Sequence, residues 1–314
     1  MLTRRHIRVK VLQSIYALRQ NEHPDLEKQE KFLFYSIDQM QDLYVLLLHL
    51  LVSLQGYGER YLERAQQKHL ATKEEKNPSK NFVNNKVISL IGESDALQQY
   101  VKNRKLDYWK EDDEYLNILF SVLRETDWYE AYLAKPSPSY TDDKEFVVQL
   151  YKTVIAPNEK LYDYLEDKRL TWLDDFPWVN TAIVKMLSKV SPKNAHQQLL
   201  PDLYKNEDDR EFARQLFRKT VLNDANLSEA IDGKTPNWDT DRIADIDMII
   251  LKMGIAEFLH FPSIPVRASL NEYLEISKEY STPKSSLFIN GILDKLVKEF
   301  TKNGKLKKIG RGLR

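Results

Sequence analysis

The chain has 314 residues, of which 42% are hydrophobic and 30% are charged, and its 47 lysines and arginines balance 47 aspartates and glutamates. It contains no cysteine, which excludes a disulfide framework, a thiolate nucleophile and cysteine-based metal sites and is typical of a reducing compartment. We therefore expect a globular, cytoplasmic protein with one large domain or two ordinary ones.

The N-terminal stretch MLTRRHIRVKVLQSIYALRQ predicts a basic helix. Its apolar residues recur at helical spacing, and no acidic residue precedes Glu22. The start of a helix is its positive end, so cations there cost a few tenths of a kcal/mol each. Charge of this sign in this place indicates an anionic partner. The cations are Arg4, Arg5, Arg8, Lys10 and Arg19.

The next stretch, LYVLLLHLLVSL (43–54), is the most apolar run in the chain. It has about a dozen residues and includes His49, whereas a membrane-spanning helix needs roughly 20. The run therefore predicts a buried helix and no membrane span. Gly56 and Gly58 predict a break directly after it.

An internal repeat of 66 residues follows in the middle of the chain. DDKEFVVQLYK (142–152) aligns with DDREFARQLFR (208–218), and an earlier copy, LQQYVKNRKLDYW (97–109), aligns with LYDYLEDKRLTWL (161–173) at an offset of 64. Each copy predicts a helix, a short helix, a loop ending in an aromatic residue and a further helix. Trp172 and Trp238 occupy this aromatic position in the two later copies. A duplicated helical unit is the economical explanation, and chance similarity among amphipathic helices is the alternative.

The C-terminal stretch YSTPKSSLFINGILDKL (280–296) predicts a helix whose start could bind an anion. Thr282 is suited to the N-cap and Pro283 to the first turn. The unpaired amides of a helix start attract anions, and Lys284, Ser285 and Ser286 follow directly. Phe288 could stack on a base, although a single aromatic is more often part of a core. For the Asn290–Gly291 pair we expect a close helix contact or a buried amide hydrogen bond, because glycine costs about 1 kcal/mol in a helix.

Beyond Glu299, the tail TKNGKLKKIGRGLR carries six cations and no acid. Both ends of the chain are therefore basic, and the body between them has a net charge of about −11. This distribution favours an anionic partner, whereas the tail alone is more typical of a frayed, solvated terminus.

Signals of catalysis or metal binding are weak throughout the sequence. GKT (233–235) lacks the earlier glycine of a phosphate-binding loop. The six histidines show no metal-ligand spacing. The acidic pairs lie where helices are predicted to begin, and the helix dipole explains them there. We expect no catalytic residue, no cofactor and no metal.

Two segments resemble the NusB family of bacterial transcription antitermination factors. One is WDTDRIADIDMIILKMGIAEFLHFPSIPVRASLNEYLEISKEYSTPKSSLFINGILDKL (238–296), and the other is the opening RRHIRVKVLQSIYA. The resemblance implies an all-α fold of NusB type, here enlarged by repeated helical units, because family members are usually less than half this length. The implied organisation is N-terminal NusB-like helices in 1–70, a repeat-containing insert in 71–205, a C-terminal NusB-like bundle in 206–301 and a basic tail in 302–314.

The resemblance also implies a function without catalysis. Family members bind single-stranded boxA RNA together with NusE, a small-subunit ribosomal protein, within an RNA polymerase antitermination complex. We expect the first two turns of the N-terminal helix to project past the bundle, so that their cations meet phosphates. The expected RNA-binding residues are Arg4, Arg5, Arg8, Lys10, Tyr16, Lys284, Ser285, Ser286, Phe288 and Asn290.

Two other functions fit parts of the sequence. A helical-repeat scaffold for protein partners, with weak or no RNA binding, is the alternative to an RNA-binding factor. NusB-like domains also precede rRNA cytosine methyltransferases, but that chemistry requires a cysteine nucleophile and a cofactor domain, and the sequence offers neither.

Overall fold

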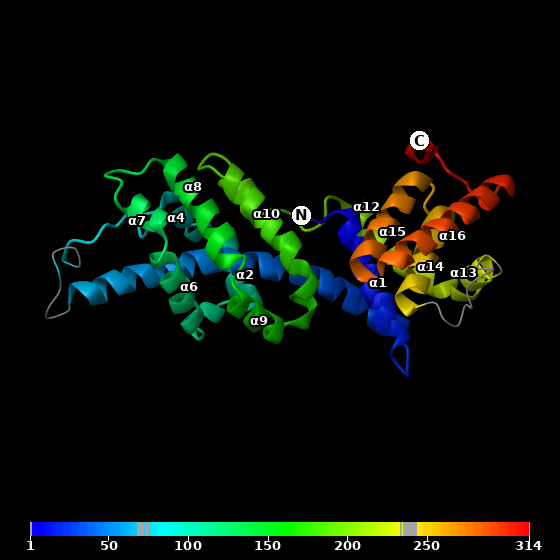
Figure 1. Cartoon of the computed structure of the whole chain (residues 1–314), viewed down its shortest axis with the longest axis horizontal. Coiled ribbons are helices and arrows are strands. Elements are labelled where there is room, and N and C mark those ends of the chain that lie inside the picture. Colours follow the sequence, from blue (N-terminus) through cyan, green and yellow to red (C-terminus); the bar gives the residue numbers. More distant parts are fainter. Residues whose placement is uncertain (1, 68–71, 73–75, 233, 235–243, 314) are drawn as a thin grey trace. The chain divides into compact units, whose positions relative to one another are not determined.

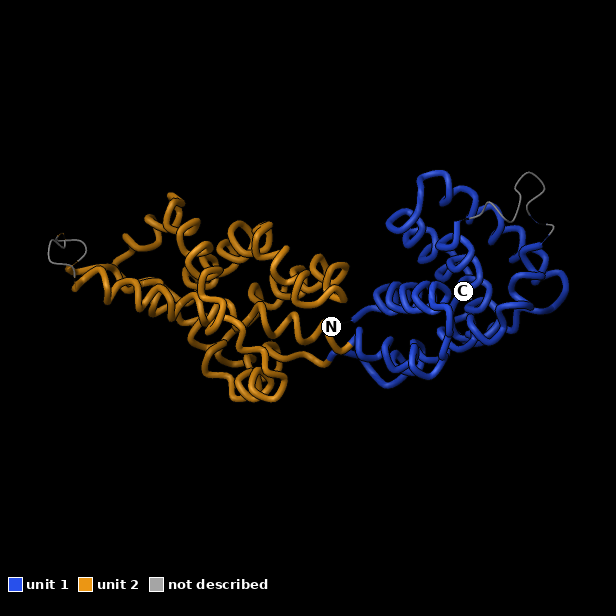
Figure 2. The backbone as a smooth tube through the Cα atoms, turned by 90° about the horizontal axis from the view of Figure 1, so that it is seen from below, with its two compact units in different colours: residues 1–37, 203–314 blue, residues 38–202 orange. Residues whose placement is uncertain are grey.

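The computed structural model describes residues 2–67, 72, 76–232, 234 and 244–313, and all regular elements in these ranges are helices. The predicted all-α class is confirmed. The chain forms two compact units (Figure 2): unit 1 contains Met1–Ile37 and Leu203–Arg314, and unit 2 contains Asp38–Asp202. The sequence-based boundary at 70/71 differs from the observed one, because most of the long helix α2 packs within unit 2.

Unit 1 joins the start of the chain to its C-terminal third. Its elements are α1 (Arg4–Arg19), the first part of α2 (Leu26–Gln66), α12 (Glu207–Leu222), α13 (Asp224–Ile231), α14 (Asp245–His260), α15 (Val266–Tyr280), α16 (Pro283–Lys302) and the 3₁₀ turn η5 (Gly310–Leu313).

Helix α14 is the centre of unit 1. It is apolar on nearly all sides, and its neighbours are α1, α12, α13, α15 and α16. A helix that is apolar all round is typical of a protein core. Gly254 permits the close approach of α16, because a Cβ atom there would lie 3.2 Å from Leu293 Cδ2.

Unit 2 contains the remainder of α2 and the helices that follow it. These are α4 (Lys86–Gly92), α5 (Asp95–Arg104), η1 (Tyr108–Lys110), α6 (Glu114–Arg124), α7 (Asp127–Leu133), α8 (Tyr140–Leu150), the π-helical turn η2 (Tyr151–Ile155), α9 (Glu159–Lys168), η3 (Leu170–Asp175), α10 (Phe176–Lys189) and α11 (Ala195–Gln198) (Figure 1).

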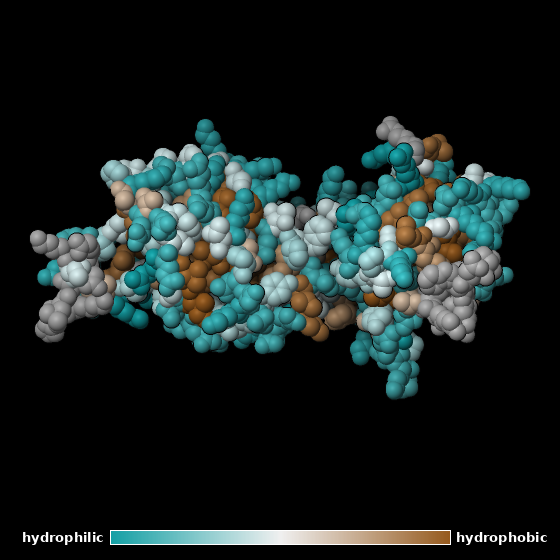
Figure 3. Space-filling view, viewed as in Figure 1, coloured by the Kyte–Doolittle hydropathy of each residue, from teal (hydrophilic) through white to brown (hydrophobic). Residues whose placement is uncertain are grey.

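The apolar run 43–54 lies in α2 and is mostly buried, as predicted. Among the described helices, α2 alone is long and apolar enough to cross a membrane, but 72% of its apolar window is buried inside the fold. Burial of this extent is typical of a core helix. The surface of each unit seen in Figure 3 is mainly hydrophilic, and apolar side chains show in small patches between the helices.

The predicted break at Gly56–Gly58 is wrong, since α2 continues without interruption to Gln66. Gly58 has a packing role instead. A Cβ atom at this position would lie 2.7 Å from Phe82 Cε1, so the absent side chain lets the Phe82 ring lie against the helix backbone. Glycine inside a helical pattern marks close packing here and not a helix end.

The two copies of the predicted 66-residue repeat agree in their helix positions and in their buried residues. In the two copies α8 aligns with α12, α9 with α13 and α10 with α14. The same repeat positions are buried in both copies: Asp143/Asp209, Phe146/Phe212, Leu150/Leu216, Tyr151/Phe217, Leu161/Leu227, Leu165/Ile231, Ile183/Ile249 and Leu187/Met253. Each copy therefore presents the same face to a core.

The earlier copy (97–109) and its counterpart (161–173) make equivalent tryptophan hydrogen bonds to α2. Trp109 Nε1 donates to the carbonyl of Leu46 at 3.1 Å, and Trp172 Nε1 donates to that of Gln39 at 2.8 Å. The two carbonyls lie seven residues apart on α2, which is about two turns. The two tryptophans are 63 residues apart, one fewer than the predicted offset. Trp238 lies outside the described residues.

The basic tail docks on unit 1 and is not a free arm. The backbone N–H of Ile309 donates to the carbonyl of Pro262 at 3.0 Å, and Lys308 Nζ donates to the carbonyl of Phe261 at 2.9 Å. Burial lowers the pKa of Lys308. This lysine lies against the carboxyl end of α14, where a cation interacts favourably with the helix dipole.

Candidate nucleic-acid interface

The arginines of α1 are paired with acidic residues of the C-terminal helices. Arg4 Nε donates to Asp209 Oδ1 on α12 at 2.9 Å, and Arg5 makes two hydrogen bonds to Glu272 on α15, at 2.9 and 3.1 Å. Arg19 contacts Asp224 on α13 at 3.3 Å. The unusual charge of the first helix is therefore balanced within unit 1 by residues more than 200 positions away.

Arg8 forms a fourth and fully buried pair. Its Nε and Nη2 atoms donate to the carboxylate of Glu257 on α14 at 2.9 and 2.6 Å. Ser269 and Tyr273 on α15 donate to the same carboxylate at 2.6 and 2.9 Å. Burial by itself would raise the pKa of Glu257, but the Arg8 charge and these hydrogen bonds hold it below its ordinary value.

Two of the residues predicted to meet phosphates are buried, so the prediction that the first two turns project past the bundle is wrong. Arg8 and Lys10 are each only 3% exposed. Because α1 packs against α12, α14 and α15, the cations on its inner face are covered. Sequence analysis missed the buried acid Glu257, which lies in the mostly apolar helix α14.

Arg4, Arg5 and Tyr16 remain accessible on α1. The exposed fractions of the Arg4 and Arg5 side chains are 39% and 31%, although both are paired, and Tyr16 is 39% exposed. Tyr16 follows Arg5 by 11 residues, which places both on one helix face about 16 Å apart. A planar ring and a guanidinium group are therefore available along one line of the surface.

The start of α16 forms the predicted cap. The side chain of Thr282 accepts a hydrogen bond from the backbone N–H of Ser285, and Pro283 occupies the first turn. Ser285 is buried, and its hydroxyl is hydrogen-bonded to that of Thr282 at 2.9 Å. Ser285 therefore completes the cap and is covered, contrary to its predicted place in a phosphate clamp.

The outer face of α16 carries the other predicted residues. Lys284 and Asn290 are exposed, and Ser286 and Phe288 are partly exposed. Leu287 was not predicted, but it is 77% exposed and follows Lys284 by three residues on the same helix face. Sequence analysis did not predict the exposure of Leu287, because apolar residues at helical spacing are usually assigned to a core.

The close helix contact expected at Gly291 is absent. Apart from its chain neighbours and the backbone of its own helix, no atom of the described residues lies within 4 Å of the position that its Cβ would take. Both Asn290 and Gly291 are exposed, so the glycine is not required by packing within unit 1. Its place beside Asn290 on an open surface leaves room for a ligand to approach the backbone.

The two basic segments border the same helix, α15. Arg5 pairs with Glu272, and Lys284 follows the end of α15 at Tyr280 by four residues. The hydrogen bond with Glu272 raises the pKa of Arg5, and Glu275 and Glu279 act in the same direction. A phosphate that approaches Arg5 must therefore compete with Glu272, whereas the ammonium group of Lys284 has no partner among the described residues.

A groove of about 460 Å³ lies beside Arg4 in unit 1, between α12 and the turn after α14. Phe212 and Phe261 meet edge to face in it at 5.2 Å, and the Arg4 guanidinium lies 5.0 Å from the centre of the Phe212 ring. Lys219 and His260 also line it. In the part of the chain that the structure describes, no cluster of acids and histidines could hold a metal ion.

Comparison with known proteins identifies the family. The family model described as "NusB family" matches residues 179–298. The transcription antitermination protein NusB of Salinibacter ruber is 34% identical over 145 residues, which cover 39% of this chain and 91% of that protein. The chain belongs to the NusB family.

Other NusB relatives match over shorter stretches. The transcription antitermination protein NusB of Chloroherpeton thalassium is 38% identical over 104 residues, covering 33% of this chain and 49% of that protein. That of Natranaerobius thermophilus is 36% identical over 97 residues, covering 31% and 70%. No solved structure matches the chain. The predicted NusB-type fold with an added helical insert is confirmed.

Proposed function

We propose that this chain is a transcription antitermination factor that binds single-stranded, boxA-like RNA through unit 1. The observation that carries the proposal is the match to an antitermination protein of which 91% is covered. The RNA would lie across the start of α16 and the accessible face of α1. A NusE-type ribosomal protein would bind together with the RNA in the RNA polymerase antitermination complex.

The accessible residues divide into three chemical groups. Lys284, Arg4 and Arg5 supply positive charge for phosphates, and each phosphate contact adds about 0.7 to the salt dependence on a single strand. Tyr16 and Phe288 supply rings for stacking on bases, worth about 1–3 kcal/mol per base. Ser286 and Asn290 supply hydrogen-bonding groups for base edges. Arg8, Lys10 and Ser285 support this surface from beneath it.

Lys284 offers the sharpest test, because its side chain is exposed and unpaired and can be changed without harm to the fold. We expect Lys284→Glu to weaken binding of a fluorescent boxA-like RNA by about fivefold or more, and to lower the slope of log affinity against log salt by about 0.7. Fluorescence anisotropy at several salt concentrations, with and without NusE, measures both quantities.

Lys193→Glu is the matched control, since Lys193 is also exposed and has no hydrogen bond or ion pair among the described residues, but lies in unit 2. Its affinity should equal that of the unaltered chain. If Lys284→Glu and the unaltered chain bind the RNA with equal affinity, the start of α16 is not part of the interface. Equal affinities for boxA-like RNA and a scrambled strand would remove sequence recognition from the proposal.

A helical-repeat scaffold is the second candidate function. It is favoured by apolar side chains on η3 of unit 2, where Leu170 is 73% exposed and Leu173 is 37% exposed. Exposed apolar residues that lie together often mark protein contacts. If Leu170→Ser abolishes capture of a protein partner while Lys284→Glu leaves RNA affinity unchanged, the scaffold is the better description.

A further inference from the structure

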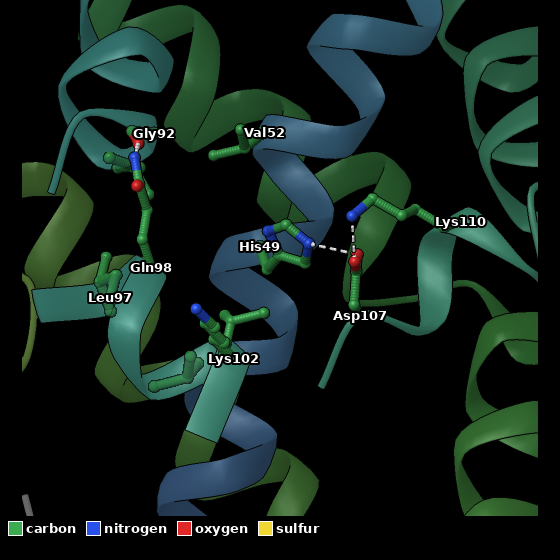
Figure 4. A pocket seen from close by; sticks show the side chains of 11 residues that line it. His49, Val52, Gly92, Leu97, Gln98, Lys102, Asp107 and Lys110 are labelled. Atoms are coloured by element: carbon green, nitrogen blue, oxygen red, sulfur yellow. Dashed lines mark hydrogen bonds and ion pairs between the residues drawn. The ribbon is translucent and has the colours of Figure 1, made fainter. Parts of the chain in front are cut away.

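Unit 2 contains a pocket of about 450 Å³ that lies outside the elements attributed to RNA binding. It is bounded by α2, the end of α4, α5 and η1 (Figure 4). Small-molecule sites in proteins usually have volumes of about 300–1,000 Å³. This pocket is therefore large enough for a compact ligand with up to about 15 non-hydrogen atoms, if each takes roughly the 30 Å³ of a water molecule.

The walls of the pocket are branched aliphatic side chains. Val45, Ile91 and Leu97 are almost fully buried and form its interior, and Val52 and Val101 are partly exposed nearer its mouth. The side chain of Gln98 is held away from the interior, because its Nε2 donates to the carbonyl of Gly92 at 2.6 Å. A ligand that fills this space must have an apolar body.

Charged groups surround the mouth. On one side, Asp107 accepts a hydrogen bond from His49 Nε2 at 3.2 Å and forms an ion pair with Lys110 (Figure 4). Burial opposes ionisation of Asp107, but Lys110 and His49 lower its pKa, so it is a carboxylate at neutral pH. This acid is already neutralised by its partners.

On the other side of the mouth, Lys102 projects from α5 and is exposed. Its ammonium group has no hydrogen bond or ion pair among the described residues. Lys102 and Lys110 together exceed the charge of Asp107 by one positive charge. The pocket therefore combines an apolar interior with an unsatisfied cation at its entrance.

We propose that this pocket binds a small amphipathic carboxylate, with its hydrocarbon chain against the valine and leucine walls and its carboxylate at Lys102. The positive charge of Lys102 favours an anionic head group, and the aliphatic side chains of the walls favour a hydrocarbon body. The proposal is independent of RNA binding, because all of its residues lie in unit 2.

Three probes with the same seven-carbon alkyl chain up to the head-group carbon test this assignment: octanoate, 1-octanol and octylamine, each below its micellar concentration. Calorimetry or methyl NMR on the full chain measures binding. We expect octanoate to bind most tightly, 1-octanol about fivefold more weakly, and octylamine not measurably. Lys102→Glu should weaken octanoate binding by about threefold to tenfold at low ionic strength, and Lys160→Glu, on the exposed surface of α9, should not alter it.

Val52→Trp is designed to fill the pocket and should abolish octanoate binding without changing RNA affinity. Lys102 is exposed, so Lys102→Glu should retain the fold and tests the proposal by itself. Octanoate affinity that is unchanged in Lys102→Glu, or equal binding of octylamine and octanoate, overturns the assignment. Equal binding of octanol and octanoate also overturns it, and would favour an uncharged apolar occupant such as a side chain of a protein partner.

Discussion

The two units contain copies of the same helical repeat, but the buried acid at the start of each copy has different hydrogen-bond partners. Asp209 in the first turn of α12 accepts a hydrogen bond from the Arg4 guanidinium. Its counterpart Asp143 in α8 accepts from the Tyr132 hydroxyl at 2.7 Å and from the backbone N–H of Lys86 at 2.9 Å. The buried position of the acid is retained in both copies, and its partner is set by the neighbouring helix.

Each unit also has, among its described residues, a carboxylate at its core that is at most 1% exposed and is bound by arginine. In unit 1, Glu257 is 0% exposed, and Arg8 is the one cation among the described residues that forms an ion pair with its carboxylate. In unit 2, Asp42 is 1% exposed and is shared by Arg104 and Arg169, with a further hydrogen bond from Tyr100. The comparison indicates that the loss of stability on removing one arginine depends on whether a second arginine binds the same carboxylate, and not on burial alone.

The largest expected effect tests this redundancy. Arg8→Ala should lower the free energy of unfolding by about 3–5 kcal/mol, because it leaves a buried, unpaired charge at Glu257. Arg104→Ala should cost about 1 kcal/mol, since Asp42 keeps Arg169 and the Arg104 side chain is 41% exposed. Urea unfolding followed by circular dichroism measures both.

The double variant Arg8→Met/Glu257→Gln is the control for Arg8→Ala. It removes both buried charges, so it should recover part of the lost stability. Equal losses for Arg8→Ala and Arg104→Ala would contradict the role given to redundancy.

Acidification to a moderate pH should lower the stability of unit 1 before that of unit 2. Burial, with help from the Arg5 charge, lowers the pKa of His6 in unit 1 from 6.5 to about 4. Between these values the unfolded chain binds a proton that the folded chain does not, so stability is complete above pH 6.5 and falls as pH drops towards 4. The loss should be on the order of 3 kcal/mol. Glu257 acts in the same direction below its ordinary value of 4.5.

Hydrogen exchange at pH 7, 6 and 5 measures this loss by segment. Protection should fall in α1 and α14 before it falls in α8 and α10, because carboxylates of unit 2 such as Asp107 titrate below 3.8. His6→Gln should flatten the dependence between pH 6.5 and 4, since a glutamine oxygen can accept the hydrogen bond that His6 Nδ1 accepts from the backbone of Thr3. An unchanged slope in this variant would show that another group is responsible.

The two tryptophan bonds to α2 test the equivalence of the copies within unit 2. Trp172→Phe and Trp109→Phe each remove an indole N–H that donates to a buried carbonyl of α2. Each should cost about 1–3 kcal/mol, and the two losses should be similar. Thermal unfolding of the paired variants gives the comparison, and losses that differ by more than about twofold would show that the copies are not equivalent in energy.

The smallest expected effect distinguishes two helical glycines. Gly291→Ala should stabilise the chain by about 0.5–1 kcal/mol, because its surroundings are open and alanine is the better helix former. Gly58→Ala should destabilise it by about 1 kcal/mol, because the new methyl group meets the Phe82 ring. Melting temperatures that move in the same direction would contradict this contrast. A fall in RNA affinity for Gly291→Ala would show that the glycine serves the interface.

The local features of the fold could be predicted from sequence because their causes lie within a few residues. Helical periodicity gave the all-α class and the burial of 43–54. The Thr282 cap and Pro283 were recognisable because capping depends on neighbouring amides. The repeat was visible because Asp143 and Asp209 begin similar helices. The end of α2 was misplaced because Gly58 reflects its contact with Phe82, a residue beyond the helix.

The candidate interface was predicted only in part, for the same reason. Lys284 lies exposed at the start of α16, where a cation available to an anion was expected, whereas the close contact or buried amide expected at Asn290–Gly291 is not found. Burial of Arg8 was not predicted, because its partner Glu257 is 249 residues away and an unpaired arginine in a sequence gives no sign of where its carboxylate lies.

The sequence by itself determined which segments are helices, which faces are apolar and to which family the chain belongs, because these depend on short-range order and on residue identity. Only the tertiary structure decided which charges are available to a partner. That outcome depends on which acids the fold brings against each cation, since a guanidinium held by a buried carboxylate is no longer free to meet a phosphate.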